Sequence, residues 1–150
     1  MKYRMYCLAE RHLSPIQKAI QSAHVILEYG LSNNTCEYRQ WVVNDKTIII
    51  LDGGSSPDML SDISVLKDGN IPYAEFHEPD MDGFRTAICF LADERVYDYD
   101  HYGRDYNHYR VLYGNDPTLP ELTYDEWTEY VGGFNNVLLK CIIANKKLAI

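Results

Sequence analysis

The chain has 150 residues, a length typical of one domain, and its apolar fraction of 46% and charged fraction of 24% are those of folded globular proteins. Disordered and fibrous classes are therefore excluded. Fourteen Lys and Arg against 22 Asp and Glu give a net charge of 14 − 22 = −8. Proteins that grip a phosphate backbone usually carry excess cations, so tRNA and other nucleic acids are disfavoured as partners.

The cysteines and apolar runs indicate the cellular compartment. No two cysteines have C-x-x-C spacing, and two of them lie in apolar runs, where a free thiol behaves as a small hydrophobic group. The longest apolar run, around Ile48 to Leu51, is far shorter than the ~18 residues of a membrane span, and residues 1–12 lack the apolar core of an export signal. We expect a cytoplasmic protein with reduced thiols and no membrane partner. No His, Cys or acidic residues have zinc-ligand spacing, so neither a metal nor a cofactor is expected.

The first predicted elements are a strand and a helix. The aromatic-rich run 3–9 favours a central strand. Ser14 followed by Pro15 and Gln17 is a helix start with a capping box, which predicts a helix from Pro15 to about Tyr29. Gly30 is expected to end this helix in a left-handed conformation.

Helical periodicity divides this first helix into two faces. One face is apolar and is expected to pack on a sheet: Ile16, Ala19, Ile20, Ala23, Ile26 and Leu27. The other face is a polar stripe near the helix N-terminus: Ser14, Lys18, Gln21 and Ser22.

The following residues complete an alternating α/β pattern. Thr35 caps a short helix that runs through Val42, residues 46–51 form a buried strand, and a helix runs from Ser56 to Gly69. Two further strands are expected over residues 72–77 and 86–92. This order predicts a three-layer α/β core over residues 1–96, with a mixed four-stranded sheet flanked by helices.

A change in composition follows the core. Between residues 97 and 130 lie eight of the 13 tyrosines, too many aromatic residues for a disordered linker. We expect an ordered acidic excursion over residues 97–133, with a short helix after Thr123. It is interpreted as a cover for the core, a dimer interface or an aromatic lid over a ligand. A C-terminal helix over residues 134–150, regular from Phe134 to Leu148, is expected to pack on the same domain.

Two short stretches resemble the type II peptidyl-tRNA hydrolase family. Residues 17–24, Gln-Lys-Ala-Ile-Gln-Ser-Ala-His, are similar to its K-x-A-x-Q-x-x-H helix, with Gln17 at the family's lysine position and Lys18 one residue later. The acidic turn from Asp80 to Thr86 leads into a Thr-led strand, as in that family. The resemblance covers about residues 2–95. The sequence around Glu-Pro-Asp at 78–80 and the segment WTEYVGGFNNVLL at 127–139 look closer to members encoded by tailed bacteriophages. It implies a homodimer in the host cytoplasm.

The candidate ligand-binding residues come from three places. The start of the first helix offers backbone N–H groups and polar side chains suited to an anion such as a phosphate. The turn before the last strand offers carboxylates for hydroxyls or a base edge, and the Tyr-rich excursion offers a cation among phenols. The full set is His12, Ser14, Lys18, Gln21, Ser22, Glu78, Asp80, Arg104 and Tyr106.

Three functions are compatible with these residues. The first is a pocket protein that binds a small phosphorylated, nucleotide-like molecule, as a phage protein would to sequester a host immune signalling nucleotide. The second is a divergent peptidyl-tRNA (ester) hydrolase, in which the resemblance implies that Lys18 and Asp80 position water and Thr86 assists. The third is a protein interaction module that docks through the acidic Tyr-rich surface.

Overall fold

The computed structural model describes residues 1–149, which divide into two compact units. The sheet unit comprises Lys2–Leu91 and the chain from Lys146 onward. The helical unit comprises Ala92–Asn145 together with Met1. The excursion and the C-terminal helix, treated separately in the sequence, thus belong to one compact unit.

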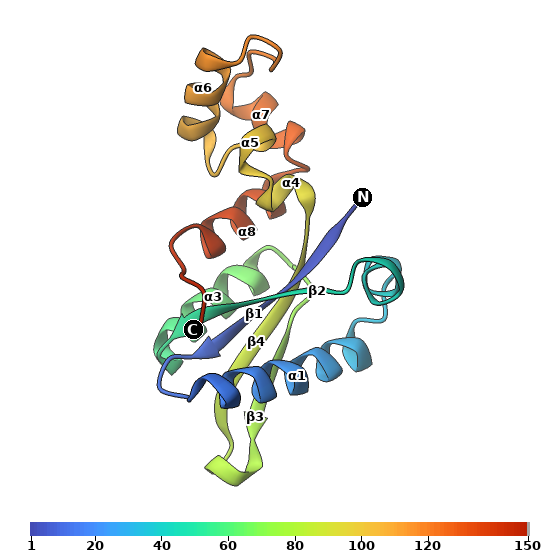
Figure 1. The fold of residues 1–150 in the computed structure, drawn as a ribbon, viewed down its shortest axis with the longest axis vertical. Coiled ribbons are helices and arrows are strands. Elements are labelled where there is room, and N and C mark those ends of the chain that lie inside the picture. The colour runs from blue at the N-terminus through green and yellow to red at the C-terminus, as the bar shows by residue number, and fades with distance from the viewer. Residues whose placement is uncertain (150) are drawn as a thin grey trace. The chain divides into compact units, whose positions relative to one another are not determined.

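The sheet unit is built on a four-stranded mixed sheet of order β2-β1-β4-β3 (Figure 1). Its strands are β1 (Tyr3–Glu10), β2 (Thr47–Gly54), β3 (Ala74–Glu78) and β4 (Phe84–Asp93). β1 and β2 run parallel, whereas β3 and β4 form an antiparallel hairpin. The predicted α/β class with a mixed four-stranded sheet is confirmed.

The helices of the sheet unit begin at good capping residues. They are α1 (Pro15–Ser32), α2 (Cys36–Gln40), the π-helix η1 (Trp41–Asp45), α3 (Ser56–Asp68) and the 3-10 helix η2 (Pro79–Met81). The side chains of Ser14, Thr35 and Ser55 accept hydrogen bonds from the first turns of α1, α2 and α3. The three predicted helix starts are therefore confirmed within a residue or two.

Gly30 does not end α1, which continues to Ser32, so the predicted stop is wrong. The glycine instead allows the Tyr38 side chain to lie close to the backbone of α1. A Cβ atom on Gly30 would lie 2.7 Å from Cζ of Tyr38 and closer still to its hydroxyl. The ring of Tyr38 lies between Tyr29 and Trp41, with centroid distances of 5.6 and 5.9 Å.

The orientation of α1 is the reverse of the prediction. Its buried residues are Lys18, Ser22, Val25 and Tyr29, spaced three or four positions apart along one face, together with Gln21 beside Ser22. The predicted apolar face is largely on the surface, with Ile16 70% and Leu27 66% exposed. The reason is the C-terminal half of the helix: Val25 and Tyr29 join the core formed with β1 and β4, and this turns the polar stripe toward the sheet.

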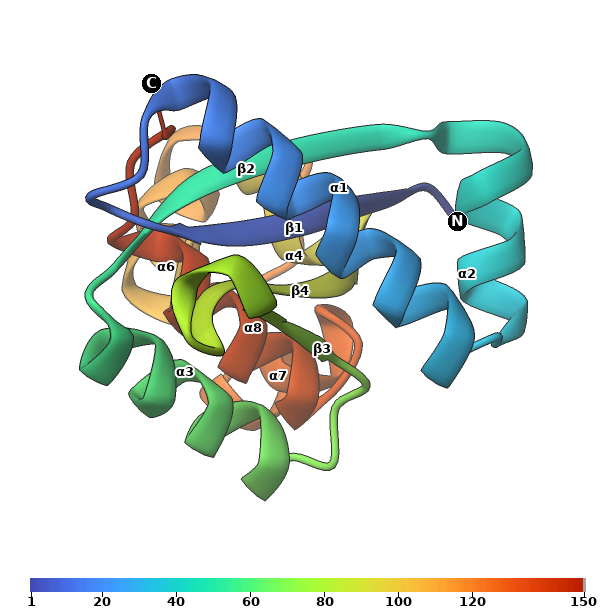
Figure 2. The ribbon, with the colours of Figure 1, turned by 90° about the horizontal axis from the view of Figure 1, so that it is seen from below.

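Both faces of the sheet are covered. Met5 and Cys7 of β1 pack in the core beneath α1, while Tyr6 and Leu8, which point the opposite way, are equally buried. The helices α1 and α3 lie on opposite sides of the strands (Figure 2). The chain therefore leaves β1 toward one face and β2 toward the other.

The helical unit consists of five short helices around an aromatic core. They are α4 (Glu94–Tyr97), α5 (Tyr99–Tyr102), α6 (Tyr106–Asn115), α7 (Tyr124–Tyr130) and α8 (Phe134–Ala144). The core holds Tyr109, Leu119, Trp127, Val131 and Val137. Within this unit, α8 packs against α4 and α7.

The helix α8 is shorter than predicted and ends at Ala144. The polar residues Asn145, Lys146 and Lys147 follow, and the chain then extends along the outer edge of β2. There Leu148 forms an antiparallel bridge with Leu51, and the Ala149 N–H donates to the Ile50 carbonyl at 3.0 Å. Leu148 and Ala149 thus continue the sheet rather than the helix.

No helix within residues 1–149 is both long and apolar enough to cross a membrane. Over the same residues, no group of three or more His, Cys, Asp and Glu side chains is placed to hold a metal ion.

Candidate functional site

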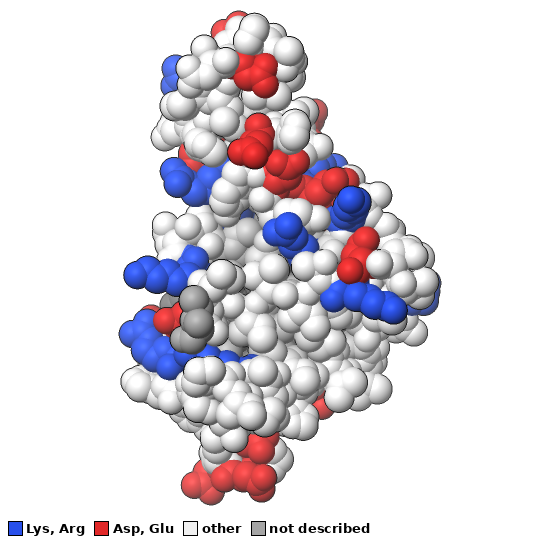
Figure 3. Space-filling model, in the orientation of Figure 1, with Lys and Arg blue, Asp and Glu red and all other residues white. Residues whose placement is uncertain are grey.

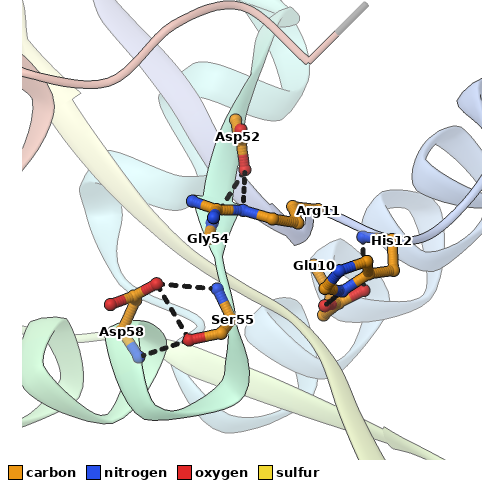
Figure 4. Close-up of polar contacts among 7 residues, drawn as sticks. All are labelled: Glu10, Arg11, His12, Asp52, Gly54, Ser55 and Asp58. Carbon is orange, nitrogen blue, oxygen red and sulfur yellow. Dashed lines mark hydrogen bonds and ion pairs between the residues drawn. The ribbon is translucent and has the colours of Figure 1, made fainter.

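The carboxyl ends of β1 and β2 form the candidate site. These strands are parallel neighbours, and the loops that follow them diverge to α1 on one face and α3 on the other. In open α/β sheets, ligands bind in the crevice that opens where the connections separate in this way. The segments at this edge are Glu10–Ser14 and Asp52–Ser55 (Figure 4).

A buried carboxylate holds an exposed imidazole at this edge. Glu10 is only 3% exposed, and one of its oxygens lies 2.8 Å from Nδ1 of His12 while the other accepts the His12 backbone N–H at 2.7 Å. The His12 side chain is 80% exposed. Because a carboxylate has no proton to give, Nδ1 must carry the hydrogen. Within residues 1–149 no hydrogen bond engages Nε2, which is left for a ligand.

Arg11 and Asp52 connect the two loops. The Arg11 N–H donates to the Gly54 carbonyl at 2.9 Å, and Asp52 accepts the Gly54 N–H at 2.8 Å. Nε of Arg11 lies 4.0 Å from Asp52, and both side chains are more than a third exposed. The backbone therefore fixes the loops, while the guanidinium is held loosely enough to meet a ligand.

The two helix N-termini at this edge differ in their electrostatics. At α3, Asp58 accepts from the Ser55 N–H at 2.8 Å and from its hydroxyl at 2.9 Å, and these hydrogen bonds lower the pKa of the Asp58 carboxyl. The N-terminus of α3 is therefore already paired with a negative charge, the Asp58 carboxylate. At α1, Ser14 accepts the Gln17 N–H at 3.2 Å, and no acidic residue lies in the first turn. A negatively charged ligand is therefore favoured at α1.

The remaining members of the predicted polar stripe lie beneath α1, against the sheet. The Thr86 hydroxyl donates to the Gln21 side chain at 2.6 Å, and the Ser22 hydroxyl donates to the Lys18 carbonyl at 2.7 Å. Lys18 is 8% exposed and Thr86 fully buried. The structure thus brings Gln21 and Thr86 together as a bond that joins α1 to β4.

The predicted acidic residues lie at the tip of the β3–β4 hairpin. Glu78 precedes η2 and Asp80 lies within it, exposed, where Figure 3 shows acidic side chains at the bottom of the view. In residues 1–149, no hydrogen bond or ion pair joins Asp80 to Lys18.

The last two predicted ligand residues belong to the helical unit, and each contacts a neighbour there. Nε of Arg104 lies 3.5 Å from the carboxylate of Asp105. The Tyr106 hydroxyl donates to the Leu122 carbonyl at 2.8 Å.

The sequence prediction included His12 and Ser14 but missed Glu10, Arg11 and Asp52. The signal was present in the chain: Glu10 and Asp52 directly follow the two predicted strands, residues 3–9 and 46–51, at the position where α/β sites collect polar groups.

Comparison with protein-family models gives no match for this chain, and comparison with curated proteins gives none either.

Proposed function

We propose that this chain binds a small phosphorylated, nucleotide-like molecule at the carboxyl ends of β1 and β2. The observation that carries the proposal is the exposed imidazole of His12, oriented by buried Glu10 beside the open N-terminus of α1. The phosphate would accept hydrogen bonds from the first turn of α1 and from the guanidinium of Arg11. The Asp52 carboxylate would accept a ribose hydroxyl.

A divergent peptidyl-tRNA (ester) hydrolase is the second candidate. The Glu10–His12 pair favours it, since a carboxylate that fixes the imidazole tautomer is the arrangement that prepares Nε2 as a general base. In this candidate His12 would activate water. Thr86 would act through Gln21 and the position of α1, because both side chains are buried. The net charge of −8 disfavours the tRNA part of such a substrate.

The resemblance to bacteriophage-encoded members of the hydrolase family extends the first candidate. We infer that the ligand is a host signalling nucleotide, which the chain would sequester in the host cytoplasm without turning it over. Excess free chain would then lower the concentration of that nucleotide.

We also propose a homodimer, formed through the α1 stripe: Ile16, Ile20, Ala23, Leu27 and Leu31. Four of these side chains are 42 to 81% exposed. Large exposed apolar surfaces on soluble proteins usually mark interfaces. Spacings of four, three, four and four residues are those of a helix–helix seam. In an antiparallel pair, Ile16 would meet Leu31 of a second copy and Ile20 would meet Leu27.

Calorimetric titration of a ribonucleotide panel, with linear, cyclic and ADP-ribose-like compounds, tests the ligand. Arg11→Ala and His12→Ala should each weaken binding about tenfold, as expected for the loss of a charge-assisted hydrogen bond. His101→Ala is the matched control, because His101 also pairs with a carboxylate at 2.8 Å and is exposed, but lies in the helical unit. Equal binding by all variants would exclude this edge. Release of peptide from peptidyl-tRNA, abolished by His12→Ala, would favour the hydrolase.

A further inference from the structure

The helical unit contains a groove outside the site described above. It has a volume of about 820 Å³, within the range of roughly 300–1,000 Å³ typical of ligand sites. One wall is the face of α6 that bears Tyr106, Tyr109, Arg110 and Tyr113. The other is the stretch from Glu121 to Thr123 with Glu126 at the start of α7.

The tyrosine hydroxyls of this groove are already engaged. Tyr106 and Tyr109 donate to the carbonyls of Leu122 and Pro120 at 2.8 and 2.6 Å, and Tyr113 donates to Glu121 at 3.2 Å. These bonds hold α6 to the opposite wall and fix the rings in place. Tyr109 is buried in the core of the unit, so the ring faces that an occupant can reach are those of Tyr106 and Tyr113, which attract cations.

Arg110 shows how a cation binds here. Its guanidinium carbon lies 6.0 Å from the centroid of the Tyr106 ring, at the outer limit of a cation–π contact. The ring also packs on Trp127, with centroids 5.9 Å apart, so its position is fixed from behind. The aromatic wall is thus suited to guanidinium groups.

The carboxylates of the groove retain free acceptors. Glu121 uses one oxygen for Tyr113, and Glu126 uses one oxygen to accept the Thr123 N–H at 3.0 Å. The second oxygen of each is left for an occupant, because the hydrogen bonds and ion pairs within residues 1–149 do not engage it.

The charge of the helical unit favours a cationic occupant. Residues 92–145 contain four Lys and Arg and ten Asp and Glu, a net charge of 4 − 10 = −6. Three of the four cations are committed: Lys140 is buried, Arg95 pairs with Asp93 at 3.0 Å, and Arg104 pairs with Asp105. An anion in the groove would meet Arg110 alone against two carboxylates.

We propose that this groove binds an arginine-bearing segment of another protein, whose guanidinium groups stack on the tyrosine rings and pair with Glu121 and Glu126. Arginine is preferred over lysine because its planar fork matches both a ring face and a carboxylate. This site lies wholly within the helical unit and is independent of the ligand proposed for the sheet unit.

Fluorescence polarisation of a fluorescein-labelled Gly-Arg-Gly-Arg-Gly peptide tests the proposal with the full chain. Glu121→Gln and Glu126→Gln should each weaken binding about two- to fivefold, as for one exposed ion pair, and added salt should weaken it further. Glutamine at 126 can still cap α7, so the fold is preserved. Glu129→Gln is the matched control: it removes the same charge from the exposed surface of α7 but lies outside the groove.

Arg110→Ala separates a cationic from an anionic occupant. If the groove takes arginine, this variant binds the peptide at least as tightly as the wild type, because a competing guanidinium has been removed. A Gly-Lys-Gly-Lys-Gly peptide should bind more weakly than the arginine peptide, and a Gly-Glu-Gly-Glu-Gly peptide should not bind. Absence of arginine-peptide binding, an equal effect of all three Glu variants, or a ribonucleotide whose binding is lost in Arg110→Ala would each overturn the proposal.

Discussion

The hydroxyl of Thr86 and the side-chain amide of Gln21, 65 positions apart in the chain, form a buried 2.6 Å hydrogen bond. Thr86→Val would keep the side-chain shape and leave the amide oxygen without a donor. Such an unsatisfied buried acceptor costs about 1–3 kcal/mol. Urea unfolding should show this loss, and Gln21→Leu added to Thr86→Val should recover part of it, because both polar partners are then removed. A double variant less stable than Thr86→Val would show that Gln21 makes its main contribution elsewhere.

The buried ammonium of Lys140 predicts a pH dependence of stability. It donates to the carbonyls of Val96 and Gly103 at 3.0 and 2.6 Å. Burial lowers its pKa to about 8, against the opposing effect of Asp93, Asp98 and Asp105. The unfolded chain therefore binds more protons than the folded one between this value and the ordinary lysine value near 10.4, and folding stability rises with pH across that window.

The slope of that rise is measurable. The free energy of unfolding should gain at most about 1.4 kcal/mol per pH unit from Lys140 above pH 8, and this gain is measured as the difference between the wild type and Lys140→Met because thiols and tyrosines titrate in the same range. Lys140→Met should lack this gain and be more stable than the wild type at neutral pH. Lys67→Met, at an exposed site on α3, is the control and should keep the wild-type slope. Parallel slopes in all three proteins would mean that the ammonium is charged in the fold at every pH tested.

The contact between Gly30 and Tyr38 predicts a reversed effect of a helix-favouring substitution. Alanine in place of glycine inside a helix ordinarily stabilises by about 1 kcal/mol. Here the added Cβ would meet the Tyr38 ring, so Gly30→Ala should lower the melting temperature. In a Tyr38→Leu background, the same substitution should raise it. If Gly30→Ala stabilises the wild-type protein, the ring must move aside at little cost.

The α1 stripe predicts the oligomeric state. Light scattering after gel filtration should give twice the 17.4 kDa of one chain for the wild type. Ile20→Lys should give a single chain, because a charge would be buried in the seam. Leu60→Lys, at a 51% exposed leucine on α3, should leave the dimer unchanged. Since two chains of charge −8 repel each other, salt should strengthen the dimer, whereas a monomeric wild type at all salt concentrations would contradict it.

Helices and strands were predicted from the sequence better than the tertiary contacts between them. Capping residues such as Ser14 and Thr35 located helix starts, because capping is a contact between residues three apart. The face of α1 that packs on the sheet could not be read from the same segment, since the choice depends on Val25 and Tyr29 meeting distant strands. Likewise, Gln21 and Thr86 were both proposed as site residues. Their mutual hydrogen bond, which buries them, is a tertiary contact without a local signal.

Composition changes near residue 97, but this change did not show that the following segment forms a unit with a core of its own. The Tyr-rich segment has the residues of an aromatic core, and it forms one around Trp127. Sequence alone could not show that this core is separate from that of the sheet, because tyrosines pack equally well on a neighbouring element.

The antiparallel bridge between Leu51 and Leu148 makes the helical unit an insertion rather than an appendage. The sheet unit receives its last edge segment only after the whole intervening stretch has been synthesised, 148 − 51 = 97 positions later. During translation the outer edge of β2 is therefore unpaired until that segment has been synthesised. Unpaired edge strands can pair with other chains. Early folding of the inserted unit would shorten the effective loop and hasten the closure. An early-folding tyrosine-rich core would thereby also shorten the time for which the β2 edge is exposed.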